Sequence, residues 1–179
     1  MKHKYVCWFA LPLCMGLACT PAPQEKVEED LIGYTNPMIG TDFTGNTYPG
    51  AQVPFGMVQL SPDNGLPGWD RISGYYYPDS TIAGFSHTHL SGTGAGDLYD
   101  ISFMPVTNPY KTGAEPLGIY SSFSHNDESA SAGYYRVLLK DYNINVELTA
   151  TERCGIQRYT FPEAESSIFL NLKKAMNWD

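Results

Sequence analysis

Glycine and proline interrupt this chain so often that little room is left for long helices. The 179 residues include 17 Gly and 13 Pro. No stretch of ten or more residues places apolar side chains at the 3.6-residue spacing of an amphipathic helix. Short segments alternate apolar and polar residues instead, which is typical of strands with one buried face. The sequence therefore predicts an all-β fold, an antiparallel β-sandwich.

The clearest alternation places Ile144, Val146 and Leu148 on one face of a strand. Alternation also predicts strands over 155–161 and 168–172, and in the second of these it groups the side chains of residues 168, 170 and 172. Aromatic and β-branched residues favour strands over 134–139 and 99–106, with 118–123 pairing nearby. Segment 36–97 is rich in turns, and long loops on a rigid sheet commonly carry function.

Composition excludes two classes of protein. The chain is 42% hydrophobic and 17% charged, with 13% aromatic residues, which is unlike a disordered protein. Its formal net charge of −8 argues against a nucleic-acid partner, for which a basic patch is expected. The length corresponds to about one domain.

The N-terminus reads as an export signal. Lys2 and Lys4 precede an apolar run over 5–18, which is too short to span a membrane and is typical of a signal peptide. Its end, Gly-Leu-Ala followed by Cys19, resembles the lipobox of bacterial lipoproteins. We therefore expect a signal peptide at 1–18, a lipid on Cys19, an acidic tether over 19–32 and a membrane-anchored protein, periplasmic or at the cell surface. Cleavage after an ordinary signal peptide and a buried N-terminal helix are the alternatives.

The other end of the chain breaks off abruptly. A strand over 168–172 is followed by seven residues that include Trp178, without a turn or a cap. A large aromatic residue so near a terminus usually packs against something further along. We expect the sandwich domain, residues 33–179, to be truncated at its C-terminal end; a short amphipathic tail is the alternative.

Trp69, Asp70 and Arg71 combine an aromatic platform with a carboxylate and a fork of donors. Sugar recognition uses this combination, because an aromatic face covers the C–H side of a pyranose and charged groups bind its hydroxyls. A salt-bridged loop around a core tryptophan is the alternative.

His87 and His89 are two residues apart, so an extended chain would place both imidazoles on one face. We expect them to bind a polar ligand or a neighbouring loop. A transition-metal site with Asp97 or Asp100 and a purely structural pair are the alternatives, and no third metal ligand stands at a recognised spacing.

The glycine-rich run at 92–96 does not predict a nucleotide site. A phosphate-binding glycine loop opens a helix and carries a lysine, whereas here a strand is expected to follow and the lysine is missing. No local pair of carboxylates can be assigned as acid and base, and no metal site is assigned.

Several blocks of the sequence together resemble one enzyme family. They are TNPMIGT at 35–41, GNTYPGA at 45–51, PFGMVQLSPD at 54–63, GYYY at 74–77, GFSHTHLSGTG at 84–94 and GD at 96–97. The long His-x-His-Leu-Ser-Gly-Thr-Gly string is specific, and the blocks occur in order. In these blocks the chain is similar to the start of glycoside hydrolase family 92, over roughly 31–179.

That resemblance implies a part of a calcium-dependent, inverting exo-α-mannosidase of the α-1,2 type acting on mannose-containing glycans. The family pairs an N-terminal β-sandwich with a C-terminal (α/α)6 barrel, which holds the catalytic acid, the base and the calcium ligands. This chain would then be the sandwich alone, without catalytic residues or metal ligands and inactive by itself. We expect Trp69, Asp70, Arg71, His87 and His89 to line the terminal-mannose pocket.

Two other functions remain open. The chain could be a free-standing carbohydrate-binding lipoprotein at the cell surface that uses the same loops. It could also be a structural or assembly lipoprotein without affinity for sugar.

Overall fold

The computed structural model describes residues 29–92 and 98–172. The expected signal peptide, Cys19, most of the acidic tether, the glycine-rich residues 93–97 and the final seven residues with Trp178 lie outside the described part. No residue within that part belongs to an α-helix. Its short 3-10 helices are not long and apolar enough to cross a membrane. The predicted all-β class is confirmed.

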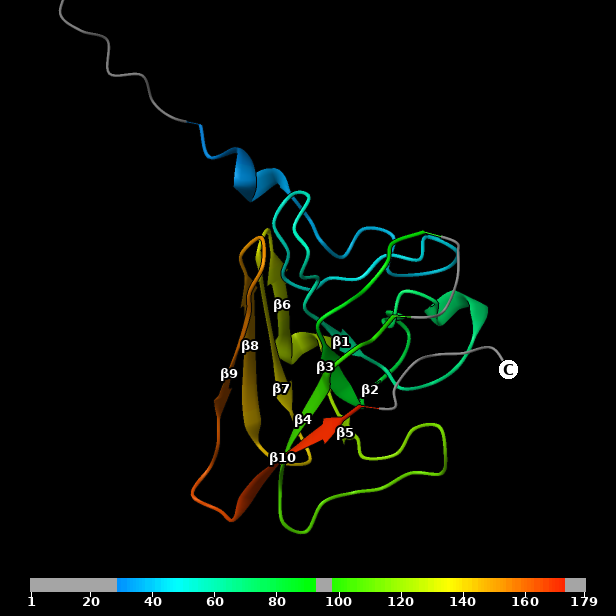
Figure 1. Cartoon of the computed structure of the whole chain (residues 1–179), viewed down its shortest axis with the longest axis vertical. Coiled ribbons are helices and arrows are strands. Elements are labelled where there is room, and N and C mark those ends of the chain that lie inside the picture. The colour runs from blue at the N-terminus through cyan, green and yellow to red at the C-terminus, as the bar shows by residue number, and fades with distance from the viewer. Residues whose placement is uncertain (1–28, 93–97, 173–179) are drawn as a thin grey trace, which may run out of the picture.

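Ten strands and three short 3-10 turns make up the described chain (Figure 1). The turns are η1 (Leu31–Tyr34), η2 (Trp69–Arg71) and η3 (His125–Asp127). The strands are β1 (Ser61–Asp63), β2 (Thr81–Ile82), β3 (Gly84–Ser86), β4 (Ser102–Thr107), β5 (Ser121–Ser122), β6 (Glu128–Ser131), β7 (Tyr134–Leu139), β8 (Ile144–Ala150), β9 (Gly155–Thr160) and β10 (Ser166–Asn171).

The strands form two four-stranded antiparallel sheets and one small pair. One sheet has the order β1-β3-β4-β10, the other is the meander β6-β7-β8-β9, and β2 pairs with β5. Side chains of both large sheets meet in a single core; Phe85 and Val106 come from one sheet, Val137 and Val146 from the other. Two antiparallel sheets around one core constitute the predicted β-sandwich.

The meander follows the alternation of the sequence closely. Ile144, Val146 and Leu148 of β8 are fully buried, as predicted. Val137 of β7 stands directly opposite Val146, so neighbouring strands bury the same row. The two-residue alternation is sufficient to predict which side chains are buried, because the other face of the meander is in contact with solvent.

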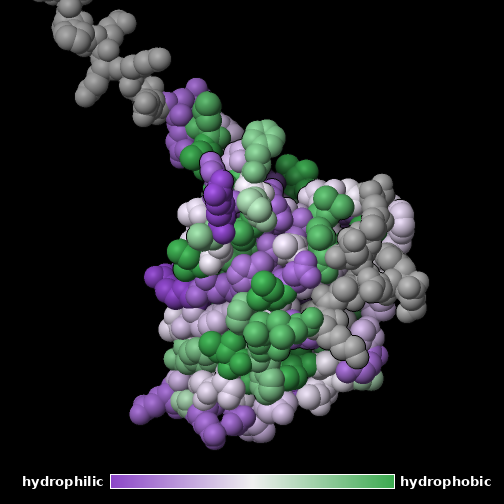
Figure 2. All heavy atoms as spheres, viewed as in Figure 1, coloured by the Kyte–Doolittle hydropathy of each residue, from purple (hydrophilic) through white to green (hydrophobic). Residues whose placement is uncertain are grey.

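Strand β10 is present where it was expected, but with its rows of side chains reversed. Ile168 and Leu170 are about half exposed, at 51% and 50%, whereas Phe169 packs against the core. Phe169 is paired with the buried Met104 of β4, and cross-strand partners share a face. Apolar side chains therefore gather on the outer face over β9 and β10 (Figure 2).

The turn-rich segment before residue 92 contains three strands that alternation did not reveal. β1, β2 and β3 have only two or three residues each, and every residue of β1 and β3 is buried. A strand this short shows no measurable period, and one buried on both faces does not alternate. The long connections of this segment lie together at one end of the sandwich (Figure 1).

η1 begins at the boundary region between tether and domain. The Asp30 carboxylate accepts hydrogen bonds from the backbone N–H groups of Ile32 and Gly33, at 3.2 and 3.4 Å, which caps the turn. The expected boundary between residues 32 and 33 falls inside this turn. Leu31, Ile32 and Tyr34 are all exposed.

Candidate functional site

The Trp69–Arg71 segment forms the short turn η2 and presents its aromatic side chain outward. Gly68 precedes the turn with a φ of 151°, a backbone region that side chains with a Cβ rarely adopt. Trp69 is 53% exposed, and Asp70 beside it is half-buried. An exposed indole next to a carboxylate is suited to covering the apolar face of a sugar while binding its hydroxyls.

Arg71, the next residue of the turn, is engaged within the protein. Its Nε and Nη2 donate to the two carboxylate oxygens of Asp79, at 2.6 and 2.5 Å, and its guanidinium lies 4.7 Å from the centre of the Tyr76 ring. The hydrogen bond with Asp79 raises the pKa of Arg71 further. This bidentate pair ties η2 to the following loop and holds Trp69 in place.

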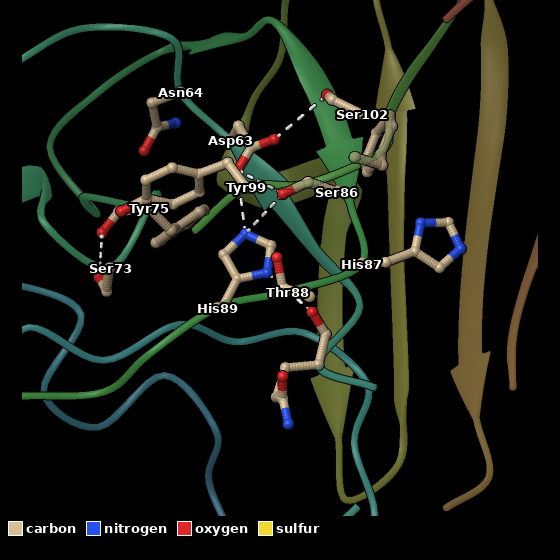
Figure 3. A network of polar contacts seen from close by, with 12 residues as sticks. Asp63, Asn64, Ser73, Tyr75, Ser86, His87, Thr88, His89, Tyr99 and Ser102 are labelled. Atoms are coloured by element: carbon tan, nitrogen blue, oxygen red, sulfur yellow. Dashed lines mark hydrogen bonds and ion pairs between the residues drawn. The ribbon is translucent and has the colours of Figure 1, made fainter. Parts of the chain in front are cut away.

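The structure separates the two histidines that were expected to share a face. Strand β3 ends at Ser86 and the chain bends at His87, so the extended geometry assumed for this pair is absent. The His87 ring turns away from His89 (Figure 3), bonds the carbonyl of Ile101 through Nδ1 at 3.1 Å and borders a cavity of about 280 Å3 between β9 and β10.

His89 is buried, with 3% exposure, and belongs to a polar network centred on Asp63 (Figure 3). Its Nε2 lies 2.9 Å from Oδ1 of Asp63, and its Nδ1 lies 2.7 Å from the carbonyl oxygen of Gln59. The Asp63 carboxylate and the Gln59 carbonyl can each accept a hydrogen bond from a ring N–H. Ser86 donates to the same carboxylate oxygen at 3.1 Å, and Ser102 to the other at 3.4 Å.

Aromatic rings enclose this network. Tyr48 and Tyr99 pack against His89 with ring centres 5.1 and 5.5 Å away. Burial raises the pKa of Tyr99, whose hydroxyl donates to the carbonyl of Ile72. Gly74 fits tightly between these groups, because a Cβ there would lie 2.6 Å from the Tyr99 ring. The network thus holds the backbone at Gln59 through His89 and the backbone at Ile72 through Tyr99.

A second buried carboxylate, Glu128, connects the meander to the loop after η2. The hydroxyl groups of Tyr75 and Tyr135 donate to it, at 3.0 and 2.5 Å, and Nδ1 of His125 lies 2.7 Å away. Burial, followed by the charge of Glu128, raises the pKa of Tyr75 and Tyr135. His125 in turn stacks on Tyr77, with ring centres 4.0 Å apart. The Trp69 segment is therefore held at Arg71 and again through Tyr75 and Tyr77.

Sequence reasoning missed both carboxylates. Asp63 ends the sequence block at 54–63 and Glu128 follows Asp127, and neither context distinguishes a buried carboxylate from a surface one. Their partners lie far along the chain, Tyr75 being 53 residues from Glu128 and Ser102 being 39 residues from Asp63. The run of tyrosines at 75–77 was the one signal available, and its members divide between the core and the surface, with Tyr75 fully buried and Tyr77 38% exposed.

Clusters of metal-binding side chains are absent from the part of the chain that the structure describes. No group of three or more His, Cys, Asp or Glu side chains within 29–92 and 98–172 is arranged to hold a metal ion. Asp63 and Glu128 instead accept hydrogen bonds from hydroxyl and imidazole groups. The transition-metal alternative for His87 and His89 finds no support in this part of the chain, and Asp97 lies outside it.

Comparisons with known proteins agree on one family. The profile of the glycosyl hydrolase family 92 N-terminal domain matches residues 34–179. A family GH92 α-mannosidase from Bacteroides thetaiotaomicron, solved in complex with mannoimidazole, is 45% identical with a TM-score of 0.75, over 80% of this chain and 20% of that one. A family GH92 inverting mannosidase from the same organism is 32% identical with a TM-score of 0.63, over 78% and 19%.

A curated relative comes from a fungus. An uncharacterized secreted glycosidase of Arthroderma benhamiae is 29% identical over 171 residues, which cover 89% of this chain and 21% of the relative. The chain thus spans about a fifth of the length of the proteins it resembles. With the profile matching nearly all of the folded part, the chain belongs to glycosyl hydrolase family 92 and carries its N-terminal domain.

Proposed function

We propose that this chain is the N-terminal sandwich of an inverting exo-α-mannosidase of the α-1,2 type that acts on mannose-containing glycans. The proposal is supported by the family and by the α-mannosidases among its solved relatives. The single observation in the chain itself that carries it is the exposed Trp69 next to Asp70, on a turn held by the Arg71–Asp79 pair.

The five candidate residues have different parts in this proposal. Trp69 and Asp70 contact the terminal mannose, the indole through its ring face and the carboxylate through sugar hydroxyls. Arg71 and His89 position the loops and do not contact the sugar. Arg71 is paired with Asp79, and His89 is buried against Asp63. His87 borders the cavity beside β9 and β10 and is proposed to contact sugar only once further chain closes over it.

The chemistry of hydrolysis is assigned to the remainder of the polypeptide. Inversion needs an acid and a base on opposite sides of the glycosidic bond, with room for a water molecule. The buried carboxylates Asp63 and Glu128 already accept hydrogen bonds from within the protein, so neither is proposed as acid or base. Sugar contacts without acid–base chemistry do not lower the barrier, and the chain alone is therefore expected to be inactive. Calcium, where the family needs it, is assigned to the missing (α/α)6 domain.

Export is part of the proposal. The fungal relative is described as secreted, and the first 18 residues have the pattern of a signal peptide. We propose in addition that a lipid on Cys19 anchors the protein to the bacterial membrane and that residues 19–32 act as the tether.

Hydrolysis of α-1,2-linked mannobiose in the presence of calcium tests this proposal. We expect no turnover by residues 20–179 and turnover by a polypeptide of the relatives' length from the same locus. In the longer protein, Trp69→Ala should lower kcat/KM at least tenfold, while Phe55→Ala, at a fully exposed aromatic residue outside η2, should not. Turnover by the short chain would refute the division of labour, and an unaffected Trp69→Ala variant would refute the role of the turn.

A further inference from the structure

The N-terminal loops border an open cavity of about 410 Å3 that none of the five candidate residues lines. Pocket volumes of roughly 300–1,000 Å3 are typical of small-molecule sites. Its walls come from the loop over 35–54, from Ser91 and from the turn between β6 and β7, which lies beside these loops (Figure 1). Four sequence blocks that carry the family resemblance, those at 35–41, 45–51, 54–63 and 84–94, therefore contribute residues to this cavity.

The described residues that line the cavity carry no charge, although the chain has a net charge of −8. Hydroxyl and amide groups are contributed by Thr47, Ser91, Ser131 and Gln52 among others, and Ile39 adds an apolar wall. Hydroxyls and amides can both donate and accept. A lining of this kind matches a neutral ligand that is rich in hydroxyl groups and has one apolar face.

Hydrogen bonds hold these groups in place before any ligand arrives. Thr47 donates from its hydroxyl to the carbonyl of Ile39 at 2.8 Å, which closes the loop on itself. Tyr48 donates to Oε1 of Gln52 at 2.6 Å. Burial, opposed by a hydrogen bond with Ser91, raises the pKa of Tyr48 to about 12, so the phenol keeps its proton at neutral pH.

One lining residue of the cavity, Tyr48, packs against the buried polar network. The ring of Tyr48 packs on His89 at 5.1 Å, and His89 is bound to Asp63. Gly50 lies so close to the start of β1 that a Cβ would be 2.2 Å from the carbonyl oxygen of Leu60 and 2.3 Å from Cβ of Ser61. Lining residues that are fixed in this way, such as Tyr48 and Gly50, lose little conformational entropy when a ligand binds.

We propose that this cavity binds one neutral hexopyranose ring, as a sugar position additional to the one assigned to Trp69 and Asp70. The apolar C–H face of the ring lies toward Ile39, and its hydroxyls exchange hydrogen bonds with the hydroxyl and amide groups. Sugar binding here does not depend on hydrolysis, and the proposed mannosidase function enters only in the choice of mannose as the probe.

Titration of the 15N-labelled full chain with D-mannose tests the proposal through backbone amide shifts. We expect saturable shifts at Thr47, Gly50 and Gly133. D-mannuronate should bind at least tenfold more weakly, because the described lining offers its carboxylate no cation. Absence of saturable shifts at these amides, or equal binding of mannuronate, would overturn the proposal.

Matched variants locate the ligand. Ser131→Trp should fill the cavity and weaken mannose binding at least tenfold, while Ser129→Trp, on the same face of β6 but outside the lining, should not. Tyr48→Phe removes the hydroxyl that bonds Gln52 and should weaken binding several-fold, with Tyr134→Phe on the outer sheet face as control. Shifts that persist in Ser131→Trp and Tyr48→Phe and disappear in Trp69→Ala would place the sugar at η2, which refutes this site and leaves the proposed function intact.

Discussion

At the scale of single residues, the arrangement around His89 depends on an absent side chain. Gly74 has a φ of +88°, and a Cβ there would lie 2.6 Å from Tyr99, 2.9 Å from Oδ1 of Asp63 and 3.0 Å from the ring of His89. Each of these groups is buried and hydrogen-bonded, so none can move without loss. Backbone strain and overpacking therefore act together at this position.

Gly74→Ala should destabilise the domain by about 3 kcal/mol or more, from overpacking added to strain at positive φ. Gly92→Ala is the matched control, because Gly92 has a φ of +94° with nothing within 4 Å of the added Cβ; strain alone should cost about 1 kcal/mol. Urea denaturation of the two variants measures the difference. Equal losses of stability would mean that packing around Asp63 and His89 tolerates the extra methyl group.

At the scale of elements, the outer face of the meander carries a row of charges across three strands. Glu147 of β8 stands opposite Arg136 of β7 and Arg158 of β9 in the registers of the two strand pairs. Arg158 donates to both carboxylate oxygens, at 2.7 and 2.5 Å, and Tyr134 donates as well. The hydrogen bonds from Arg158, followed by that from Tyr134, lower the pKa of Glu147 to about 2.

This row should make a contribution to stability that acid removes. A carboxyl group whose folded pKa is depressed stabilises the fold above its unfolded pKa and loses that effect as pH falls through the folded value. Glu147→Gln should therefore cause a small drop in Tm at pH 7 that shrinks between about pH 4.5 and 2. Thermal melts across this range measure it, with Glu163→Gln on the β9–β10 connection as control. A difference in Tm that stays constant down to pH 2 would contradict the assignment.

At the scale of the whole molecule, the outer face over β9 and β10 carries a patch of exposed apolar side chains (Figure 2). Ile156 is 58% exposed, Leu172 78%, and Ile168 and Leu170 about half. β10 is also the edge strand of its sheet, and an unprotected edge with apolar side chains invites pairing with another chain. In a longer polypeptide, further chain is expected to cover this surface.

Residues 20–179 alone should therefore self-associate through a second copy at β10. Ile168→Lys combined with Leu170→Lys should raise the monomer fraction severalfold, because lysine on an edge strand opposes pairing. Phe55→Lys combined with Met57→Lys, at two exposed apolar residues elsewhere, is the matched control. Light scattering coupled to size-exclusion chromatography measures the outcome, and an equal effect of both pairs would show that general hydrophobicity, not the β10 edge, drives association.

The sequence by itself determined the features that depend on near neighbours. Alternation over two residues predicted β8 and β9 and the buried row at Ile144, Val146 and Leu148. Aromatic and β-branched residues predicted β7, and contiguous blocks pointed to the family. The candidate combination of Trp69, Asp70 and Arg71 also lay within three consecutive residues. These properties are local, so a local pattern is enough to reveal them.

Only the tertiary structure decided which groups meet across the fold. It placed Phe169 and not Ile168 toward the core, paired Arg71 with Asp79, and separated His87 from His89. It also joined Asp63 to His89 across 26 residues and Glu128 to Tyr75 across 53. An alternating strand has two faces, and contacts with distant segments decide which of them is buried. A buried carboxylate likewise accepts hydrogen bonds from the donors that packing brings close to it. No local sequence pattern contains either kind of contact.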